Sequence, residues 1–350
     1  MHRRRIMKGY IAVDCGKYNT KVDAFNPESG QEQKIRYRTK VREGTFDDDM
    51  FDRGTYIVQI DNGPVYKIGN DAKNEPSMET SKKSEIHKVC TMTAIAIASA
   101  KLGADEVSVA VGMPLQLAVI PEERIEYKNF ILGNDNEKHE VLIKSDSNTP
   151  PVSIHFTVTK RLVYPEGIGV LYEYPQKVDG PTAIIDIGNL NTNNTYTDGF
   201  HIIRESCFTD EMGGKVLISG LAQQLTSELR MRCDDNLAAS TLLRPYEKRE
   251  LHVRSGNKEV AEKSRQIIDN YLMEHVGAIK TKCDTRHWPL DFMNVICVGG
   301  TSRLLEREIF MTFGDNAFIP ENPEFANVCG FLKKMCADAN IDLTKVRAKK

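Results

Sequence analysis

The sequence predicts an α/β protein built from two related domains. The chain has 350 residues, which is more than one small core usually covers, so two domains are expected. Short apolar strand patterns alternate with longer helical patterns along the chain. An apolar strand ending in Asp-x-Gly opens each half, at residues 11–16 and again at residues 184–188. The alternation and this repeat together predict two units of similar design.

The composition is that of an ordinary globular protein, with 40% hydrophobic and 27% charged residues. A net charge of −2 gives no reason to expect direct binding to nucleic acid. The longest apolar stretch, around residues 93–100, is too short to span a bilayer, and no apolar segment follows the basic N-terminus. We therefore expect a cytoplasmic protein whose eight cysteines, none in a Cys-x-x-Cys pair, are reduced thiols. Two translation starts stay open, Met1 and Met7.

The first half is predicted to begin with strands and to continue into helix–strand units. Strand patterns beside Asn-Gly or Gly-Pro turns occur at residues 9–13, 21–25, 56–60 and 65–68. Acidic residues in the stretch 43–54 predict an exposed loop. Small and apolar residues predict a buried helix over 84–102, which Gly103 ends. The later elements are strands at 106–111, 140–143 and 152–163, and a helix at 166–174.

The second half restarts after a Gly-Pro pair, so the segment 177–181 is the predicted hinge between domains. The expected elements are strands at 182–186, 193–197, 200–205 and 292–298, and helices at 211–232, 257–282, 302–313 and 323–339. A basic tail at 345–350 follows. We predict a first domain over residues 1–180, a second over 181–322, and a closing helix with the tail over 323–350.

The turn after the first strand has the residue types of a phosphate-binding loop. Asp14 ends the strand, and a small-residue turn leads to Lys21 on the next strand. Backbone N–H groups of such a turn can face phosphate oxygens, and a carboxylate can hold a hydrated Mg²⁺. A purely structural turn is the alternative for this pattern alone. A second such turn at Asp186 and a later strand ending in Gly299-Gly300 favour two loops that hold one triphosphate.

These motifs, in this order, resemble those of the actin-like ATPases, and within them the plasmid-segregation actins of the ParM type. Residues 14–21 resemble the first phosphate loop, residues 186–192 the second, and residues 295–302 the adenosine motif. Residues 164–169 are similar to the ParM segment whose Pro-Glu carries the catalytic glutamate, and residues 323–330 to the helix that returns to the first domain. The resemblance implies the actin/Hsp70/hexokinase-like ATPase fold, with two related domains flanking a nucleotide cleft.

The second phosphate loop departs from the family pattern. Asn189-Leu190-Asn191 stands where the family has a further glycine. A leucine side chain would crowd a close backbone approach to phosphate, so we expect a different loop path, which asparagines can tolerate.

The resemblance implies hydrolysis of a nucleoside triphosphate, ATP or GTP, with Glu166 and Asp186 as the catalytic residues. Glu166 is expected to position or deprotonate the attacking water, and capping of the helix after Pro165 is the alternative. Asp14 and Asp186 are expected to orient Mg²⁺ through water, and Lys21 to contact the β-phosphate. The remaining expected nucleotide contacts come from the three motifs and from a Gly-Gly pair at a helix start: Gly16, Lys17, Tyr18, Asn19, Gly188, Asn189, Asn191, Gly213, Gly214, Gly299, Gly300 and Thr301.

The implied function is a filament-forming ATPase that moves plasmid DNA through an adaptor protein bound to a centromere-like site. The expected partners are further copies of the chain and a DNA-binding adaptor of the ParR type, with no direct nucleic-acid or membrane contact. The alternative from the same fold superfamily is a sugar or acetate kinase, which needs a substrate base and a sugar pocket. The compact length and the Pro-Glu segment favour the filament former.

Overall fold

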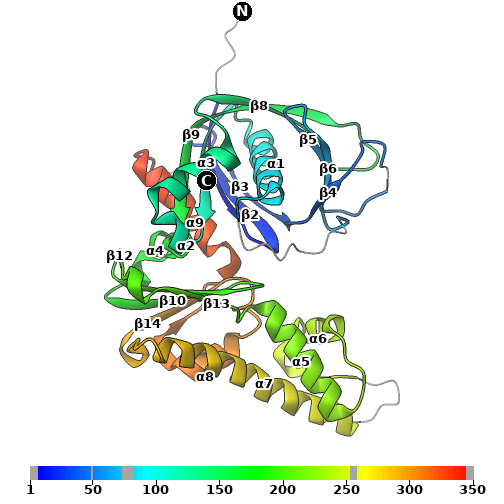
Figure 1. The fold of residues 1–350 in the computed structure, drawn as a ribbon, viewed down its shortest axis with the longest axis vertical. Coiled ribbons are helices and arrows are strands. Elements are labelled where there is room, and N and C mark those ends of the chain that lie inside the picture. The colour runs from blue at the N-terminus through cyan, green and yellow to red at the C-terminus, as the bar shows by residue number, and fades with distance from the viewer. Residues whose placement is uncertain (1–6, 49, 73–81, 253–257, 344–350) are drawn as a thin grey trace, which may run out of the picture. The chain divides into compact units, whose positions relative to one another are not determined.

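A computed structural model describes residues 7–48, 50–72, 82–252 and 258–343 of the chain, which forms two compact units (Figure 1). Unit 1 comprises Met1–Glu173 and Asn327–Lys350, and unit 2 comprises Tyr174–Ala326. Each unit has its own sheet and its own core, so the predicted α/β class is confirmed. The basic residues before Met7 and the basic tail lie outside the described residues.

Unit 1 is organised around a mixed sheet whose centre is parallel. β1 (Lys8–Cys15) pairs antiparallel with β2 (Asn19–Phe25) and parallel with β7 (Glu106–Met113), which is parallel to β9 (Val152–Pro165). The other strands are β3 (Glu32–Arg38), β4 (Val41–Glu43), β5 (Thr55–Ile60), β6 (Val65–Gly69) and β8 (Glu137–Lys144). Their order in the sheet is β3-β2-β1-β7-β9-β8-β5-β6-β4.

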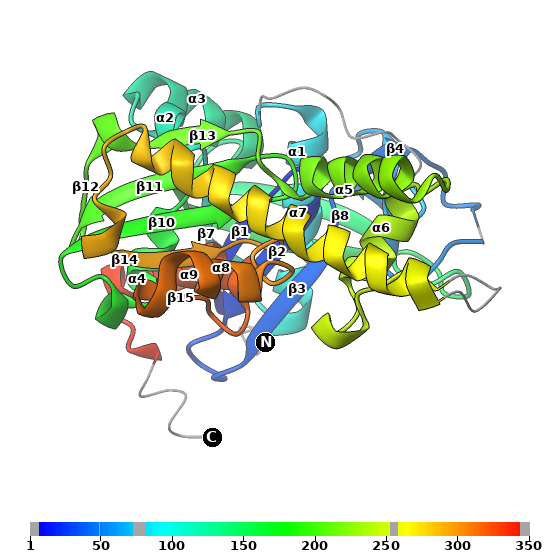
Figure 2. The same ribbon diagram turned by 90° about the horizontal axis from the view of Figure 1, so that it is seen from below.

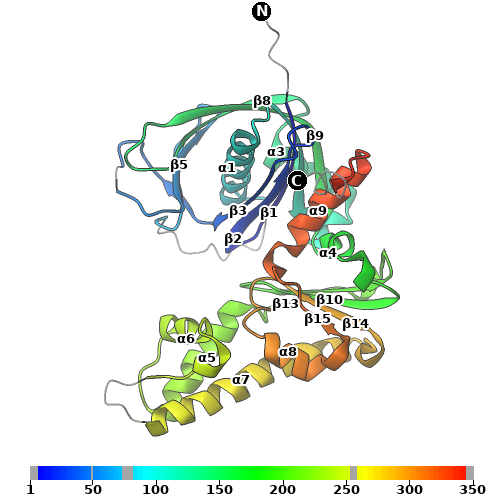
Figure 3. The same ribbon diagram turned by 180° about the vertical axis from the view of Figure 1, so that it is seen from behind.

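The sheet of unit 1 curls around α1 (Glu85–Leu102), whose small and apolar side chains are almost all buried (Figure 1). Gly103 ends this helix with φ 62°, a left-handed conformation that glycine adopts without steric cost. The remaining helices of unit 1 are α2 (Leu115–Ala118), α3 (Pro121–Leu132), α4 (Ile168–Glu173) and α9 (Ala326–Asp338). Figure 3 shows α9 beside α4.

Unit 2 has a smaller sheet with helices packed on one face. Its strands are β10 (Pro181–Ile187), β11 (Thr192–Asp198), β12 (His201–Ile202), β13 (Phe208–Asp210), β14 (Asn294–Val298) and β15 (Ala317–Phe318). The order is β12-β11-β10-β14-β15, and β13 pairs with β11. The helices are α5 (Gly214–Leu229), α6 (Asp235–Leu242), α7 (Lys258–Asp284) and α8 (Glu306–Phe313). Figure 2 shows α7 running along this face beside α5 and α8.

Single turns of 3₁₀ helix connect several elements of the second half. They are η1 (Pro175–Lys177), η2 (Arg204–Ser206), η3 (Tyr246–Lys248), η4 (Leu290–Phe292), η5 (Gly314–Asn316) and η6 (Pro323–Phe325). None of the helices that the structure describes has the length and apolar character needed to cross a lipid bilayer.

The strand pairing around β1 recurs around β10. β10 pairs antiparallel with β11 and parallel with β14, as β1 does with β2 and β7. The registers correspond at the chemistry-bearing ends of the strands. Asp14 is opposite Lys21 in the first hairpin, and Asp186 is opposite Asn193 in the second. The repeat inferred from two Asp-x-Gly motifs is therefore a repeat of topology.

Two predicted elements of unit 2 were wrong in extent. The strand predicted at 200–205 is only β12, because the chain leaves the sheet after Ile203 donates its N–H to the Tyr196 carbonyl and then turns into η2. The helix predicted at 302–313 begins only at Glu306. Residues 301–305 form turns instead, and the Ser302 hydroxyl donates a hydrogen bond to the Val298 carbonyl. This turn carries the polar residues of the Gly-Gly motif.

Two helices, α2 and α3, and two strands, β3 and β4, of unit 1 were missed. The helix α3 begins at Pro121, which suits a first helical position, but buries only Tyr127, Ile131 and Leu132 among its twelve residues. Its periodic apolar signal is therefore weak. The strand β3 consists largely of charged and polar residues because it lies at the sheet edge, with only Ile35 and Tyr37 buried.

Candidate functional site

The turn that joins β1 to β2 holds a buried carboxylate against a lysine. Asp14 is 6% exposed at the end of β1. The ammonium of Lys21, directly across the hairpin, lies 2.7 Å from Asp14 Oδ2. The Gly16 N–H donates to the Asn19 carbonyl at 3.1 Å and closes the turn. The sequence thus folds locally into a tight loop that carries one fixed ion pair.

A second lysine completes this cluster from a distant part of the chain. Lys82, just before α1, is 7% exposed. Its ammonium forms an ion pair with Glu166 Oε1 and lies 3.9 Å from Asp14 Oδ1. Glu166 follows β9 directly, and its N–H donates to the Met113 carbonyl at 2.8 Å, which ties it to the end of β7. Unit 1 therefore brings together three residues that the sequence singles out, Asp14, Lys21 and Glu166, with Lys82 between the two carboxylates.

The electrostatics of this cluster favour an anion. Burial acts to raise the pKa of Asp14, but Lys21 and Lys82 outweigh it and hold the pKa below its usual range, so the carboxylate is ionised. Burial likewise opposes the charged form of Lys82, yet Glu166 and Asp14 raise its pKa above the usual range. With Lys17 in the turn, the described residues here supply three ammonium groups and two carboxylates. The excess positive charge suits a phosphate.

His87 in the first turn of α1 is held neutral beside this charge. Burial lowers its pKa from 6.5 to about 3, and the nearby ammonium groups of Lys82 and Lys17 act in the same direction. The His87 Nδ1 atom lies 2.8 Å from the Ser84 hydroxyl. The proximity of Lys82 and Lys17 to one imidazole places both ammonium groups at the same end of the sheet.

His87 gives the folded protein a pH dependence. Between pH 6.5 and about 3 the unfolded chain binds a proton that folded His87 does not, so the free energy of unfolding falls as the pH falls. The expected slope is up to about 1.4 kcal/mol per pH unit. Urea unfolding at about pH 7 and about pH 5 measures it. His87→Gln should reduce the slope, whereas His155→Gln, which removes an exposed histidine, should keep it. Equal slopes in wild type and His87→Gln would contradict this assignment.

Buried hydroxyl groups that contact one another support the backbone of the first loop. The Thr20 hydroxyl lies 2.9 Å from that of Thr39 and 3.3 Å from Cys15 Sγ. The Thr39 N–H donates to the Tyr18 carbonyl at 3.0 Å. These contacts fix the path of the turn. The ring of Tyr18 is exposed and lies under the Arg38 guanidinium, whose carbon is 3.7 Å from the ring centroid.

The second loop, in unit 2, closes as the first does. The Gly188 N–H donates to the Asn191 carbonyl at 2.9 Å, which matches the Gly16–Asn19 bond. We expected Leu190 to give this loop a different backbone path. The hydrogen bond that closes the turn does not show such a difference. The physical reason is Gly213, which lies against this backbone. A side chain there would place its first carbon 2.7 Å from the Asn189 carbonyl carbon.

The predicted residues of unit 2 converge on this loop. The Gly188 carbonyl accepts hydrogen bonds from the Gly214 N–H at 2.9 Å and from the Thr301 hydroxyl at 2.8 Å. Gly299 has φ 86°, and a methyl group there would overlap Asp186 and lie 2.7 Å from the Ile187 carbonyl carbon. A methyl on Gly300 would reach only Glu324, at 4.0 Å. Gly213 and Gly214 thus pack the loop onto α5, and their contact with a ligand stays a prediction.

Sequence reasoning missed Lys82. It stands in a polar stretch beside Lys83, and no local pattern separates the two. The only signal is chemical, because an isolated buried carboxylate pair such as Asp14 and Glu166 needs a cation. Sequence alone does not reveal which of 47 lysines and arginines supplies it.

The donor set suits a hydrated magnesium ion better than a directly bound one. Within the described ranges no group of three or more His, Cys, Asp or Glu side chains could hold a metal. Both oxygens of Asp14 already face ammonium groups. Mg²⁺ usually keeps several waters and binds one or two carboxylates together with substrate phosphates. The residues present fit that arrangement.

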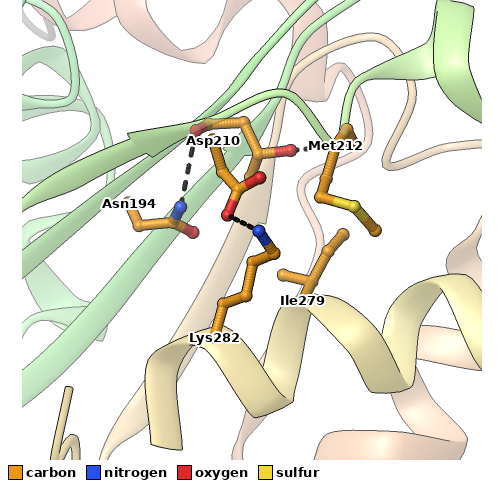
Figure 4. Close-up of a pocket in the computed structure, with 6 residues that line it drawn as sticks. Asn194, Asp210, Met212, Ile279 and Lys282 are labelled. Carbon is orange, nitrogen blue, oxygen red and sulfur yellow. Dashed lines mark hydrogen bonds and ion pairs between the residues drawn. The ribbon is translucent and has the colours of Figure 1, made fainter. Parts of the chain in front are cut away.

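A hollow in unit 2 is not a candidate ligand site. Figure 4 shows it between β11, β13 and α7, where Lys282 pairs with Asp210 at 2.7 Å. Its volume is about 140 Å³, including space open to solvent. Ligand pockets usually hold roughly 300–1,000 Å³. The lining residues are Thr192, Asn194, Asp210, Met212, Ile279 and Lys282.

Comparison with known proteins identifies the architecture that holds these loops. Residues 12–169 match the sequence profile of the family described as "Actin like proteins N terminal domain". This part of the chain therefore resembles the N-terminal domain of the actin-like proteins. No match was found among curated proteins. The predicted actin-like fold and the resemblance to ParM-type proteins are confirmed by this match and by the solved structures that the chain resembles.

Three solved structures illustrate the likeness of the whole chain to proteins of the actin-like fold. The archaeal actin homologue Ta0583 has 18% identity and a TM-score of 0.69, with 93% of this chain and 98% of that one covered. The apo ParM protein of psk41 has 13% identity and a TM-score of 0.68, with 97% and 99% covered. The Alp12 filament structure has 22% identity and a TM-score of 0.68, with 95% and 99% covered. Ta0583 has also been solved in complex with ADP.

Proposed function

We propose that this chain is an actin-like protein that binds and hydrolyses ATP or GTP and that nucleotide binding drives its assembly into filaments. The observation that carries the proposal is the cluster of Asp14, Lys21, Lys82 and Glu166 at the end of the parallel strands of unit 1, in which Asp14 and Lys82 are buried. Charged groups are almost never fully buried unless they are paired, and clusters of perturbed titratable groups are candidates for functional sites. The Alp12 filament and the ADP complex of Ta0583 support the same conclusion for proteins of this fold.

In the proposed mechanism each residue of unit 1 has one task. Lys21 and Lys17 neutralise phosphate charge, and the Gly16 turn sets the backbone close to it. Glu166 accepts a proton from the attacking water. Asp14 would hold the hydration shell of Mg²⁺, which supplies neutralisation of phosphate charge when bound. Phosphoryl transfer needs alignment and charge stabilisation more than covalent chemistry, and these residues of unit 1 can supply both.

The roles proposed for unit 2 rest on the convergence around Gly188. Asp186 would face the hydrated metal, and the Asn189 and Asn191 segment would approach the phosphates. Gly299, Gly300 and Thr301 would approach the nucleoside. That both loops hold the same triphosphate stays a prediction, as does the domain division at residues 180 and 322.

The test uses the purified full chain with ATP, with GTP and without nucleotide. We expect phosphate release, together with filaments in electron micrographs that form only with a nucleotide. A non-hydrolysable analogue separates binding from turnover, because it should support assembly without phosphate release. Equal assembly without nucleotide would contradict the proposal. Phosphate transfer to a hexose or to acetate without assembly would favour a kinase.

We further propose that the filament segregates plasmid DNA in the cytoplasm through a DNA-binding adaptor of the ParR type. The likeness to the psk41 ParM protein supports this proposal, and the net charge of −2 favours an adaptor over direct DNA contact. Retention of the replicon that encodes the chain, with and without an intact copy of this gene, measures it. Unchanged retention without the gene would contradict it.

A further inference from the structure

Lys82 is more deeply buried than its neighbour in sequence, Lys83, and pairs with different residues. Its side chain is 8% exposed, whereas that of Lys83 is 27% exposed and pairs with Glu123 and Glu126 on α3. Burying an ammonium group costs several kcal/mol unless it is paired and hydrogen-bonded. A methionine would fill similar space without that cost. The burial of Lys82 therefore requires a specific use for its charge.

The distances show which carboxylate is the close partner of Lys82. Asp14 has its own close cation, since Lys21 lies 2.7 Å from Oδ2 while Lys82 stays 3.9 Å from Oδ1. The close partner of Lys82 is Glu166. A single ammonium group thus fixes the carboxylate of Glu166 and links it to the turn that begins at Asp14. The pair joins the start of α1 to the end of β9, 84 residues apart in sequence.

We infer that Lys82 is a positioning residue for hydrolysis, which holds the Glu166 carboxylate in place and aimed at the attacking water. This inference rests on the proposed function. In the step concerned, the water oxygen bonds to the γ-phosphorus and the bond to the bridging oxygen breaks. Its electron pair stays on the diphosphate, and the water proton passes to Glu166. Lys82 transfers no proton and acts through the carboxylate that it holds.

The test compares five variants of the full chain, Glu166→Gln among them, by steady-state phosphate release and by nucleotide titration. Lys82→Met should lower kcat about 10²-fold with KM changed only a few-fold. Lys82→Arg keeps the charge and should recover part of this loss. Lys83→Met, the matched control, should keep the wild-type rate. The double variant Lys82→Met/Glu166→Gln should be no slower than Glu166→Gln alone, because Lys82 acts through Glu166.

Several results would overturn the assignment. One is a Lys82→Met protein that binds nucleotide normally and turns over within about threefold of wild type. Another is a double variant in which the two losses multiply, since Lys82 would then act independently of Glu166. If Lys82→Met does not fold, the test uses Lys82→Arg and the double variant instead. The double variant removes both charges of the pair. Failure of the proposed function is distinct, because the wild-type chain itself would then release no phosphate.

Discussion

Replacing Glu166 with glutamine is expected to lower kcat for nucleotide hydrolysis by about 10²–10⁴-fold. Glutamine has nearly the same size but cannot accept the proton of the attacking water. Nucleotide affinity should change little, because the proposed phosphate contacts are those of Lys17 in the turn after β1 and Lys21 on β2. Single-turnover phosphate release and an equilibrium titration with a non-hydrolysable analogue separate the two quantities.

A capping role for Glu166 predicts a different outcome. The N–H of Gly167, the next residue, donates to Asn327 Oδ1 at 3.0 Å, and the Glu166 carboxylate pairs with Lys82. The start of α4 therefore has a cap that Glu166→Gln leaves in place. If Glu166 were only a cap, the variant would lose stability and keep its rate per folded molecule.

The control for this prediction is Glu173→Gln at the end of α4, the helix that begins two residues after Glu166. Glu173 pairs with Lys333 at 3.0 Å and is also a partly buried carboxylate, but it lies away from the Asp14 turn. We expect its turnover to stay within about twofold of wild type, since it has no part in the proposed chemistry. A folded Glu166→Gln protein with the wild-type rate would remove Glu166 from the mechanism.

The parts of the site that sequence could predict are those with local signals. The hairpins that carry Asp14 and Asp186 were predictable because an alternating apolar strand, a small-residue turn and a second strand lie within about fifteen residues. Their antiparallel register then places Lys21 opposite Asp14 without further information. The strand ending in Gly299 was visible for the same reason.

The parts that could not be predicted depend on contacts between distant segments. Lys82 reaches Glu166 across 84 residues, and nothing in its surroundings distinguishes it from Lys83. The closing of the second loop depended likewise on Gly213, whose missing side chain leaves room for the backbone at Leu190. A pattern read along the chain measures local preference, whereas these features depend on which backbone segments touch.

The second prediction with a large expected effect concerns Gly330→Ala, at the contact between α4 and α9. A methyl group on Gly330 would overlap the backbone of Gly169, and one on Gly169 would lie 2.7 Å from the Asn327 Cα atom. Backbone atoms cannot move aside as a flexible side chain can. We therefore expect Gly330→Ala to lower the free energy of unfolding by about 1–3 kcal/mol, measured by urea unfolding.

Activity should fall with stability in this variant, because Glu166 stands three residues before Gly169 and Asn327 caps the same turn. A shift of α4 away from α9 would move the carboxylate from Lys82 and from the Asp14 turn. The matched control is Gly277→Ala in α7, where a methyl group meets nothing within 4 Å. Alanine should stabilise that helix by about 0.5–1 kcal/mol. A Gly330→Ala protein as stable as wild type would mean that α4 and α9 do not approach as closely as described, and the position of Glu166 would need revision.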